Sequence, residues 1–437
     1  MEIRDYAADD PLFRRIVDRG RAQSDEAGAA ATAIVRDVRD RGDDALLEYT
    51  RRFDRAALTP ATLRASAAEF DQARHQVDTE YLTALSLARA NIRHFHEYQK
   101  RQGYDHSVAD GTRLSRVVLP LASVGVYCPA GGAPLVSSML MGVVPAQVAG
   151  VQRICVAIPP RPDGSIHPHM LMAAHALDID EVYKMGGAQA IAALAYGTAS
   201  VAAVDKVVGP GNVYVTRAKR EVWGQVGIDQ AYGPSEAVIV ADRAASARFA
   251  AIELLAQAEH GSGYEMAVLL TDDRSMAAAV KIEMERGLAD LDAGAQEKIR
   301  IVLDRFAGLF VCRDLEEAIQ AANRLAPEHL VLMTRRDAEL LPDVVHAGAV
   351  FVGPWSPVAV GDFYAGTNHI LPTGGAARHA SGCGVSDFVR EMSIIEYSAK
   401  RLAHTGQHVI KMAETEGLPA HAAAIRARLE DMLPNHP

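Results

Sequence analysis

Residues 123–158, SVGVYCPAGGAPLVSSMLMGVVPAQVAGVQRICVAI, carry the pattern that decides the fold. A short apolar run, Ser123–Tyr127, is followed by a glycine-rich turn and then by a stretch with a helical pattern. A second apolar run, Arg153–Ile158, comes next. Strands that alternate with helices in this way predict a parallel sheet with crossover helices.

The same rhythm extends along most of the chain. Two further apolar runs complete a first block, residues 181–184 and 206–208. After Ser235 the rhythm restarts, and the strand candidates are 237–240, 266–270, 309–312, 329–333 and 349–352. The sequence therefore predicts an α/β protein with two Rossmann-like domains, residues 116–235 and 236–376. Ligands of such sheets bind beyond the carboxyl ends of the strands.

The two ends of the chain lack this rhythm. Residues 1–115 are predicted to be a mostly helical segment that packs on the body, with helices over about 27–50 and from Tyr81 onward. Residues 377–437 are predicted to be a helical tail without strands. The tail is too short for a core of its own. We therefore expect it to pack on the body or on a second subunit.

The composition excludes several classes of protein. Of 437 residues, 49% are hydrophobic and 23% charged, and the net charge is −10 without a basic cluster, so we expect no nucleic-acid partner. There is no apolar run of about 18 residues, so we expect no membrane span. The charged N-terminus predicts no signal peptide. Four separated cysteines, Cys128, Cys155, Cys312 and Cys383, indicate buried thiols in a reducing, cytoplasmic compartment.

Three glycine-rich turns follow predicted strands and lead into helical patterns. They are residues 129–132 (PAGG), 186–189 (GGAQ) and 209–212 (GPGN). Each alone is typical of an ordinary strand-to-helix turn, and no standard nucleotide-binding fingerprint is present. Three in one block favour a dinucleotide site, because glycine lets the backbone approach a ligand and helix N-termini favour phosphate.

Polar residues gather at four places in the second half of the chain: residues 257–260 (QAEH), 327–329 (PEH), 361–369 (GDFYAGTNH) and 416–421 (EGLPAH). Histidine, aspartate and glutamine together can bind Zn²⁺ or Mn²⁺, although a lone histidine is more often a surface or core residue. For Glu328 and His329, a structural hydrogen-bonded pair and an acid/base pair are equally compatible with the sequence.

At these positions the chain resembles the histidinol dehydrogenase family. The matching stretches follow the family's order from about residue 124 to residue 428: VGVYCPAGGAPLVSS, KMGGAQAIAALAYGT, VDKVVGPGNVYVTRAKR, YGPSEAVIVAD, LLAQAEH, NRLAPEHLVL, GDFYAGTNHILPT and EGLPAHAAAIRAR. The resemblance implies an enzyme that oxidises histidinol to histidine through the aldehyde, in two steps that each use one NAD.

The resemblance also implies roles for individual residues. The acid/base pair would be Glu328 and His329. One zinc ion per subunit would be held by four residues, which would also contact substrate: Gln257, His260, Asp362 and His421. Further substrate contacts would come from Ser137, Ser235, His329, His369 and Glu416. NAD would contact Tyr127, Gln189 and Asn212. The family forms homodimers in which the C-terminal tail of one subunit completes the site of the other.

Three departures from the family pattern lie close to the expected site. Ala130 replaces a glycine, Gly261 stands where an acidic residue is frequent, and Val358 replaces a glutamate. These changes leave two alternatives open. One is a related enzyme that uses the same zinc and NAD chemistry on another small polar alcohol, such as a sulfonated diol. The other is a catalytically silent binding protein, which the intact acid/base pair disfavours.

Overall fold

A computed structural model describes residues 1–19, 25–130, 133–260 and 262–432. The chain forms two compact units. Unit 1 contains Met1–Gln99 and Leu121–Phe388, and unit 2 contains Lys100–Pro120 and the chain from Val389 onward. Each unit is described by itself. No helix among the described residues is both long and apolar enough to cross a membrane.

The first sheet of unit 1 has five parallel strands in the order β6-β5-β4-β7-β8. The strands are β4 (Ser123–Tyr127), β5 (Arg153–Ile158), β6 (Val182–Lys184), β7 (Lys206–Val208) and β8 (Gly227–Ile228). The chain moves outward from β4 to β6 and then returns to the other side of β4. This reversal makes a topological switch point between β4 and β7, where ligands of doubly wound sheets bind.

The second sheet repeats this arrangement in the order β1-β11-β10-β9-β12-β13, again all parallel. Its strands are β1 (Ile3–Asp5), β9 (Glu236–Ala241), β10 (Met266–Thr271), β11 (Ala307–Val311), β12 (His329–Met333) and β13 (Ala349–Val352). The switch point lies between β9 and β12. The predicted α/β fold with two Rossmann-like sheets is therefore confirmed.

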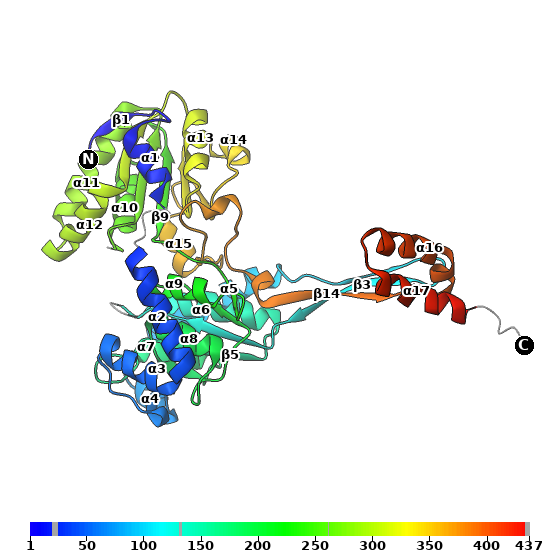
Figure 1. Ribbon diagram of the computed structural model, residues 1–437. Coiled ribbons are helices and arrows are strands. Elements are labelled where there is room, and N and C mark those ends of the chain that lie inside the picture. Colours follow the sequence, from blue (N-terminus) through cyan, green and yellow to red (C-terminus); the bar gives the residue numbers. More distant parts are fainter. Residues whose placement is uncertain (20–24, 131–132, 261, 433–437) are drawn as a thin grey trace, which may run out of the picture. The chain divides into compact units, whose positions relative to one another are not determined.

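Helices cover both faces of each sheet, as a parallel sheet requires. Around the first sheet lie α2 (Asp25–Arg41), α3 (Asp43–Tyr49), α4 (Ala67–Arg74), α5 (Thr79–Glu97), α6 (Val136–Ala149), α7 (Pro168–Ala176), α8 (Gly187–Tyr196) and α9 (Val213–Val222). Around the second lie α1 (Pro11–Val17), α10 (Ala247–Ala258), α11 (Arg274–Ala289), α12 (Ala293–Arg305), α13 (Leu315–Leu325), α14 (Asp337–Leu340) and α15 (Val358–Phe363). Figure 1 shows α11 and α12 on one side of the second sheet and α13 and α14 on the other.

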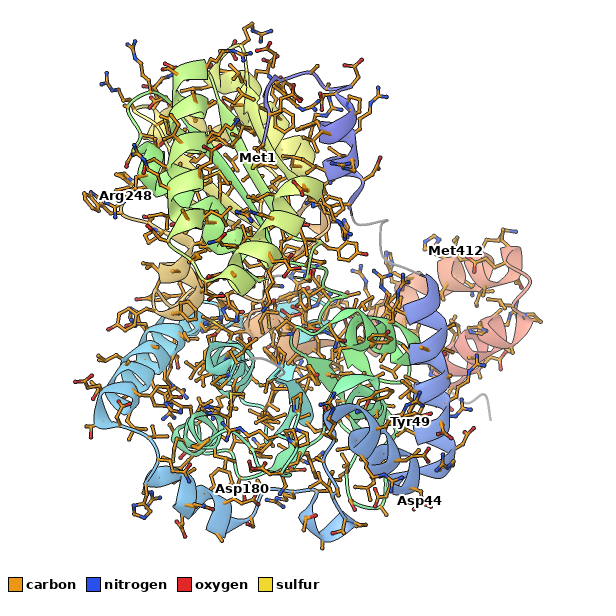
Figure 2. All side chains as sticks on the ribbon, turned by 90° about the vertical axis from the view of Figure 1, so that its left-hand side faces the viewer. Met1, Asp44, Tyr49, Asp180, Arg248 and Met412 are labelled. Carbon is orange, nitrogen blue, oxygen red and sulfur yellow. The ribbon has the colours of Figure 1, made fainter. Side chains whose placement is uncertain are left out.

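Alternate residues of each strand enter different cores. In β4, Val124 and Val126 pack with α5, α6 and α7, whereas Tyr127 packs with α2, α8 and α9 on the opposite face. In β9, Val238 packs with α1 and α13 on one face, and Ile239 packs with α10, α11 and α12 on the other. Polar side chains such as that of Arg248 on α10 lie on the outer surface (Figure 2). All four cysteines are buried free thiols, as the sequence predicted.

The predicted helix over residues 27–50 is two helices, α2 and α3, which meet at Gly42. Gly42 has a φ of 59°, and a residue in this left-handed region ends an α-helix. Short helical turns complete unit 1: Thr50–Asp54, Pro60–Thr62, Leu341–Asp343, Ala376–Arg378 and Val385–Phe388.

Unit 2 is an antiparallel sheet with a helical hairpin. The sheet has the order β14-β3-β2, formed by β2 (Tyr104–Ser107), β3 (Arg113–Pro120) and β14 (Val389–Glu396). The hairpin consists of α16 (Ala399–Thr415) and α17 (Pro419–Asp431). The prediction of a tail without strands is therefore wrong, because β14 pairs with a segment that lies far away in the sequence. The helices share only a small apolar cluster: Ile410, Ala413 and Ala422, with Ile425 and Leu429 against it.

The turn after β7 requires glycine at residue 209. Gly209 has a φ of 115°, and a Cβ there would collide with the carbonyl oxygen of Tyr127 at the end of β4. The backbone of this turn therefore lies directly against the neighbouring strand, at the switch point of the first sheet.

We expect Gly209→Ala to destabilise unit 1 more than Gly224→Ala does. Both glycines have a positive φ, 115° and 101°, but a Cβ at Gly224 would meet nothing within 4 Å. Backbone strain alone costs about 1 kcal/mol, and the collision at Gly209 adds to it. Thermal melting of the two variants measures the difference. Equal melting temperatures would show that the β7 turn moves away from β4 at little cost.

Candidate active site

A pocket of about 300 Å³ collects most of the residues to which the sequence assigned a role in substrate binding or catalysis. The predicted residues that line it are Ser137, Ser235, His260, Glu328, His329, Asp362 and His369. Pro129 and Pro210, which follow β4 and β7, also line it. The pocket thus lies beyond the carboxyl ends of the first sheet.

The second sheet meets the pocket with the amino ends of its strands. Ser235 directly precedes β9, Glu328 directly precedes β12, and His329 is the first residue of β12. The candidate pocket therefore lies beyond the carboxyl ends of the strands in the first sheet, but at the amino ends of the strands in the second. The two sheets meet at the pocket by opposite ends of their strands.

His329 is a buried imidazole with one occupied and one free nitrogen. Its Nδ1 lies 3.0 Å from the carbonyl oxygen of Glu236, and since a carbonyl only accepts, Nδ1 carries the proton. Its Nε2 has no hydrogen-bond partner and lies 3.8 Å from Oδ1 of Asp362. Burial lowers the pKa of His329, against the opposing charge of Asp362. The neutral ring can therefore accept a proton at Nε2.

Glu328 is buried beside His329 and is held through one oxygen. Its Oε2 accepts hydrogen bonds from the hydroxyl of Ser235 at 2.6 Å and from the backbone N–H of Glu236 at 2.9 Å. Burial raises the pKa of Glu328 to about 8, although the Ser235 hydrogen bond opposes the rise. The group can therefore exchange a proton near neutral pH, as acid/base catalysis requires.

A buried ion pair that the sequence analysis missed lies next to these two residues, outside the lining of the pocket. Arg19 binds the carboxylate of Glu236 with two hydrogen bonds of 2.6 Å. A charged residue at the start of the apolar run 237–240 was visible in the sequence, but its partner more than two hundred positions earlier was not.

Asp362 and His369 form another side of the pocket. Nδ1 of His369 donates to the backbone carbonyl of Asp362 at 2.9 Å, and its Nε2 lies 3.5 Å from the hydroxyl of Ser138. Burial lowers the pKa of His369 to about 4, so the ring is neutral. Burial raises the pKa of Asp362, and the nearby imidazoles of His329 and His260 oppose that rise. The side chain that approaches His369 is Ser138, next to the predicted Ser137.

Gln257 and His260 lie at the C-terminal end of α10. Gln257 is buried, and its Nε2 has no hydrogen-bond partner. Nδ1 of His260 lies 3.2 Å from the carbonyl oxygen of Gln257, so its Nε2 is the nitrogen that can bind elsewhere. A buried amide without a partner needs one, and a flip of the amide would offer its oxygen instead.

Unit 1 offers side-chain atoms of the types that bind zinc. An amide oxygen, an imidazole nitrogen and a carboxylate oxygen are available from Gln257, His260 and Asp362, and zinc accepts such ligands. Among the described residues, no three His, Cys, Asp or Glu side chains form a group that could hold a metal. The fourth expected ligand, His421, and the expected substrate contact Glu416 belong to unit 2.

The three predicted NAD contacts lie at strand ends of the first sheet and at the helices that follow. The hydroxyl of Tyr127, the last residue of β4, accepts a 3.2 Å hydrogen bond from the N–H of Gly187. Gln189 is buried in the first turn of α8, and its Oε1 has no partner. Asn212 caps α9, because its Oδ1 accepts from the backbone N–H groups of Tyr214 and Val215.

Part of the predicted turns lies outside the described residues. This applies to Gly131 and Gly132 of the first glycine-rich turn and to Gly261 after the QAEH segment. The third departure from the family pattern, Val358, is the buried first residue of α15, the helix that also carries Asp362.

Comparison with known proteins connects this site to one family. A family model described as histidinol dehydrogenase matches residues 17–429. Histidinol dehydrogenase of Heliobacterium mobile is 46% identical over 397 residues, which cover 91% of this chain and 92% of that one. The enzyme of the same name from Halalkalibacterium halodurans is 45% identical over 97% of this chain and 98% of its own.

A solved structure gives the same result. The crystal structure of histidinol dehydrogenase from Elizabethkingia anophelis matches with a TM-score of 0.90 and 34% identity, and the match covers 99% of this chain and 98% of that chain. The likeness therefore extends over both Rossmann-like sheets and over unit 2.

The raised pKa of Glu328 predicts how stability depends on pH. The folded protein holds this proton up to about pH 8, whereas the unfolded chain releases it near 4.5. The contribution of Glu328 to stability is therefore greatest below pH 4.5 and falls as the pH rises to 8. Glu328→Gln removes this dependence. We expect the stability of the variant relative to the unaltered protein to rise with pH, by up to about 1.4 kcal/mol per pH unit. Denaturant unfolding from pH 5 to 8 measures the slope, and parallel curves would contradict the prediction.

Proposed function

The chain belongs to the histidinol dehydrogenase family, and from this we propose that it oxidises L-histidinol to L-histidine through the aldehyde with two NAD. The observation that carries the proposal is the free Nε2 of His329, which lines the pocket beside the buried carboxyl of Glu328. The relatives described above bear the name histidinol dehydrogenase, so a different small alcohol is not favoured.

The first oxidation needs a base for the alcohol proton. His329 is suited to this role, because its Nδ1 is occupied by the Glu236 carbonyl and its Nε2 can accept. Ser137, Ser235, His369 and, from unit 2, Glu416 would contact the substrate. Tyr127, Gln189 and Asn212 would contact NAD, which when bound supplies the electron acceptor of both oxidations.

The second oxidation needs water to add to the aldehyde. His329 and the ionised form of Glu328 would accept the protons of this water, since both side chains line the same pocket. Gln257, His260, Asp362 and His421 would hold one zinc ion per subunit, which when bound makes an attached alcohol more acidic. The substrate contacts named above would orient the substrate and exclude bulk water.

A homodimer and a cytoplasmic location complete the proposal. Unit 2 carries His421 and Glu416, and the described part of its helical hairpin shares a small apolar cluster, which supports a role against a second subunit. Four buried free cysteines support a reducing compartment.

The direct test of the function is NADH production by the purified protein. L-histidinol, histidinal and a panel of small diols and amino alcohols are offered with NAD. We expect two NADH per histidinol and a lower kcat/KM with each of the other alcohols. A higher kcat/KM with another alcohol, for example a sulfonated diol, would overturn the substrate assignment.

The two oxidations separate the roles of Glu328 and His329. His329→Ala should lower turnover in both steps, since each needs a proton removed, by about 10²–10⁴-fold. Glu328→Gln should mainly impair aldehyde oxidation, because only that step needs an activated water. Assays that start from the alcohol and from the aldehyde, with melting temperature and zinc content, measure this. Equal losses in both steps for Glu328→Gln, together with unfolding, would show that the pair is structural.

Mixing two inactive variants tests whether unit 2 completes a partner's site. His260→Ala removes a ligand of unit 1, and His421→Ala removes one of unit 2. In a dimer with exchanged tails, a mixed dimer has one site that lacks both ligands and one intact site, so activity should return on mixing after mild dissociation. Mixing each variant with itself is the control. No recovery, with mixed dimers present by mass spectrometry, would contradict the exchange.

A further inference from the structure

Arg19 and Glu236 form an almost fully buried ion pair, with 4% and 2% of their side chains exposed. Arg19 lies just after α1, and Glu236 is the first residue of β9. Neither residue lines the pocket. Burying two charges costs several kcal/mol, and a well-packed apolar pair is often equally stable. Stability alone therefore does not explain why the chain keeps this pair.

The donors to the carboxylate of Glu236 come from three different segments of the chain. Oε1 accepts from Nε of Arg19 at 2.6 Å and from the backbone N–H of Gly374 at 2.6 Å. Oε2 accepts from Nη2 of Arg19 at 2.6 Å and from the backbone N–H of Glu328 at 3.2 Å. One side chain thus fixes the loop that follows His369 and the entry to β12.

Arg19 is fixed in turn by backbone carbonyls. Its Nη1 donates to Ile16 at 3.0 Å and its Nη2 to Leu325 at 2.9 Å. Leu325 is the last residue of α13, three positions before Glu328. The guanidinium therefore ties α1 and the end of α13 to the carboxylate, and its planar fork holds the carboxylate in one orientation.

The backbone of Glu236 contacts both catalytic side chains. Its N–H donates to Oε2 of Glu328 at 2.9 Å, and its carbonyl accepts from Nδ1 of His329 at 3.0 Å. The first contact fixes the carboxyl of Glu328, and the second fixes the tautomer that leaves Nε2 free. Both depend on where the start of β9 lies, and the carboxylate of Glu236 joins this point to Arg19, Gly374 and Glu328.

We propose that Arg19 and Glu236 are positioning residues that hold Glu328 and His329 in their reactive arrangement. The proposal rests on the proposed function, because it assigns the purpose of the pair to that acid/base chemistry. Neither residue touches substrate. A catalytic group that moves by about 1 Å can lose on the order of 10²-fold in rate, so a rigid attachment at this point has a direct kinetic consequence.

A second arginine–glutamate pair provides a matched control. Arg153 also binds its partner, Glu181, through Nε and Nη2, at 3.1 and 2.6 Å. It also donates to two backbone carbonyls, those of Ala202 and Ala203. This pair is half-buried at the start of β5 and contacts no residue that lines the pocket.

The experiment compares two double variants of the full-length, zinc-loaded protein. Arg19→Met with Glu236→Gln removes both buried charges, so that no unpaired charge remains to unfold the chain. Arg153→Met with Glu181→Gln is the control. We expect the first to lower kcat about 10- to 100-fold at nearly unchanged KM for NAD, and the second to change kcat by less than about threefold. Arg19→Lys keeps the positive charge but not the planar guanidinium, so we expect its kcat to lie between those of the two double variants.

A second measurement does not depend on turnover. Imidazole ¹⁵N NMR, with the His329 signal assigned by its loss in His329→Asn, reports which ring nitrogen is protonated. We expect a single Nδ1–H form in the unaltered protein and in the control, and a mixture in Arg19→Met with Glu236→Gln. If the unaltered protein fails to oxidise histidinol, the proposed function falls, and this spectrum alone decides the positioning role. Equal kcat values for the two double variants, or an unchanged His329 tautomer, would overturn the proposal.

Discussion

The carboxylate of Glu236 enters the protein interior at the first residue of β9, and it is stable there because the guanidinium of Arg19 neutralises it. With the charge matched, the backbone N–H and carbonyl of Glu236 remain available to Glu328 and His329. Strand β9 pairs with β12 in a register that sets Ala237 beside His329. The acid/base pair is thus attached to the middle of the second sheet, where neighbouring strands leave little freedom to move.

The buried strands could be predicted from the sequence almost to the residue. The expected runs 123–127, 153–158, 206–208 and 329–333 coincide with β4, β5, β7 and β12. These strands are covered by helices on both faces, so their sequences are mostly apolar runs, with glycine or proline close to the end of several of them. For strands that are buried on both faces, the local sequence alone is therefore enough to predict the strand.

Two strands that are short or exposed, and whose partners lie far away in the sequence, were not predicted. β14 is exposed along most of its length and pairs with β3, about 275 residues earlier, in antiparallel register. β1 has three residues and is a strand only because it pairs with β11. In both cases the pairing partner stabilises the strand, and a local pattern of charged and apolar residues cannot reveal that partner.

The residues of the candidate site differ in a similar way in how visible they are in the sequence. Adjacent residues such as Glu328 and His329 stand out in a sequence, whereas Gln257 was assigned only through family resemblance and Arg19 was not found. Within a strand, adjacent side chains point to opposite faces, so two neighbours could not both reach one pocket. Glu328 and His329 both reach it because Glu328 precedes β12 and only His329 belongs to it. A strand entry is one place where two sequence neighbours can both reach one pocket. There the carbonyl of Glu328 still accepts a hydrogen bond from the N–H of Ala349 on β13, whereas its N–H and its side chain bind Glu236. Glu236 thus holds both the backbone and the carboxyl of Glu328 from the adjacent strand, at the amino end by which the second sheet meets the pocket.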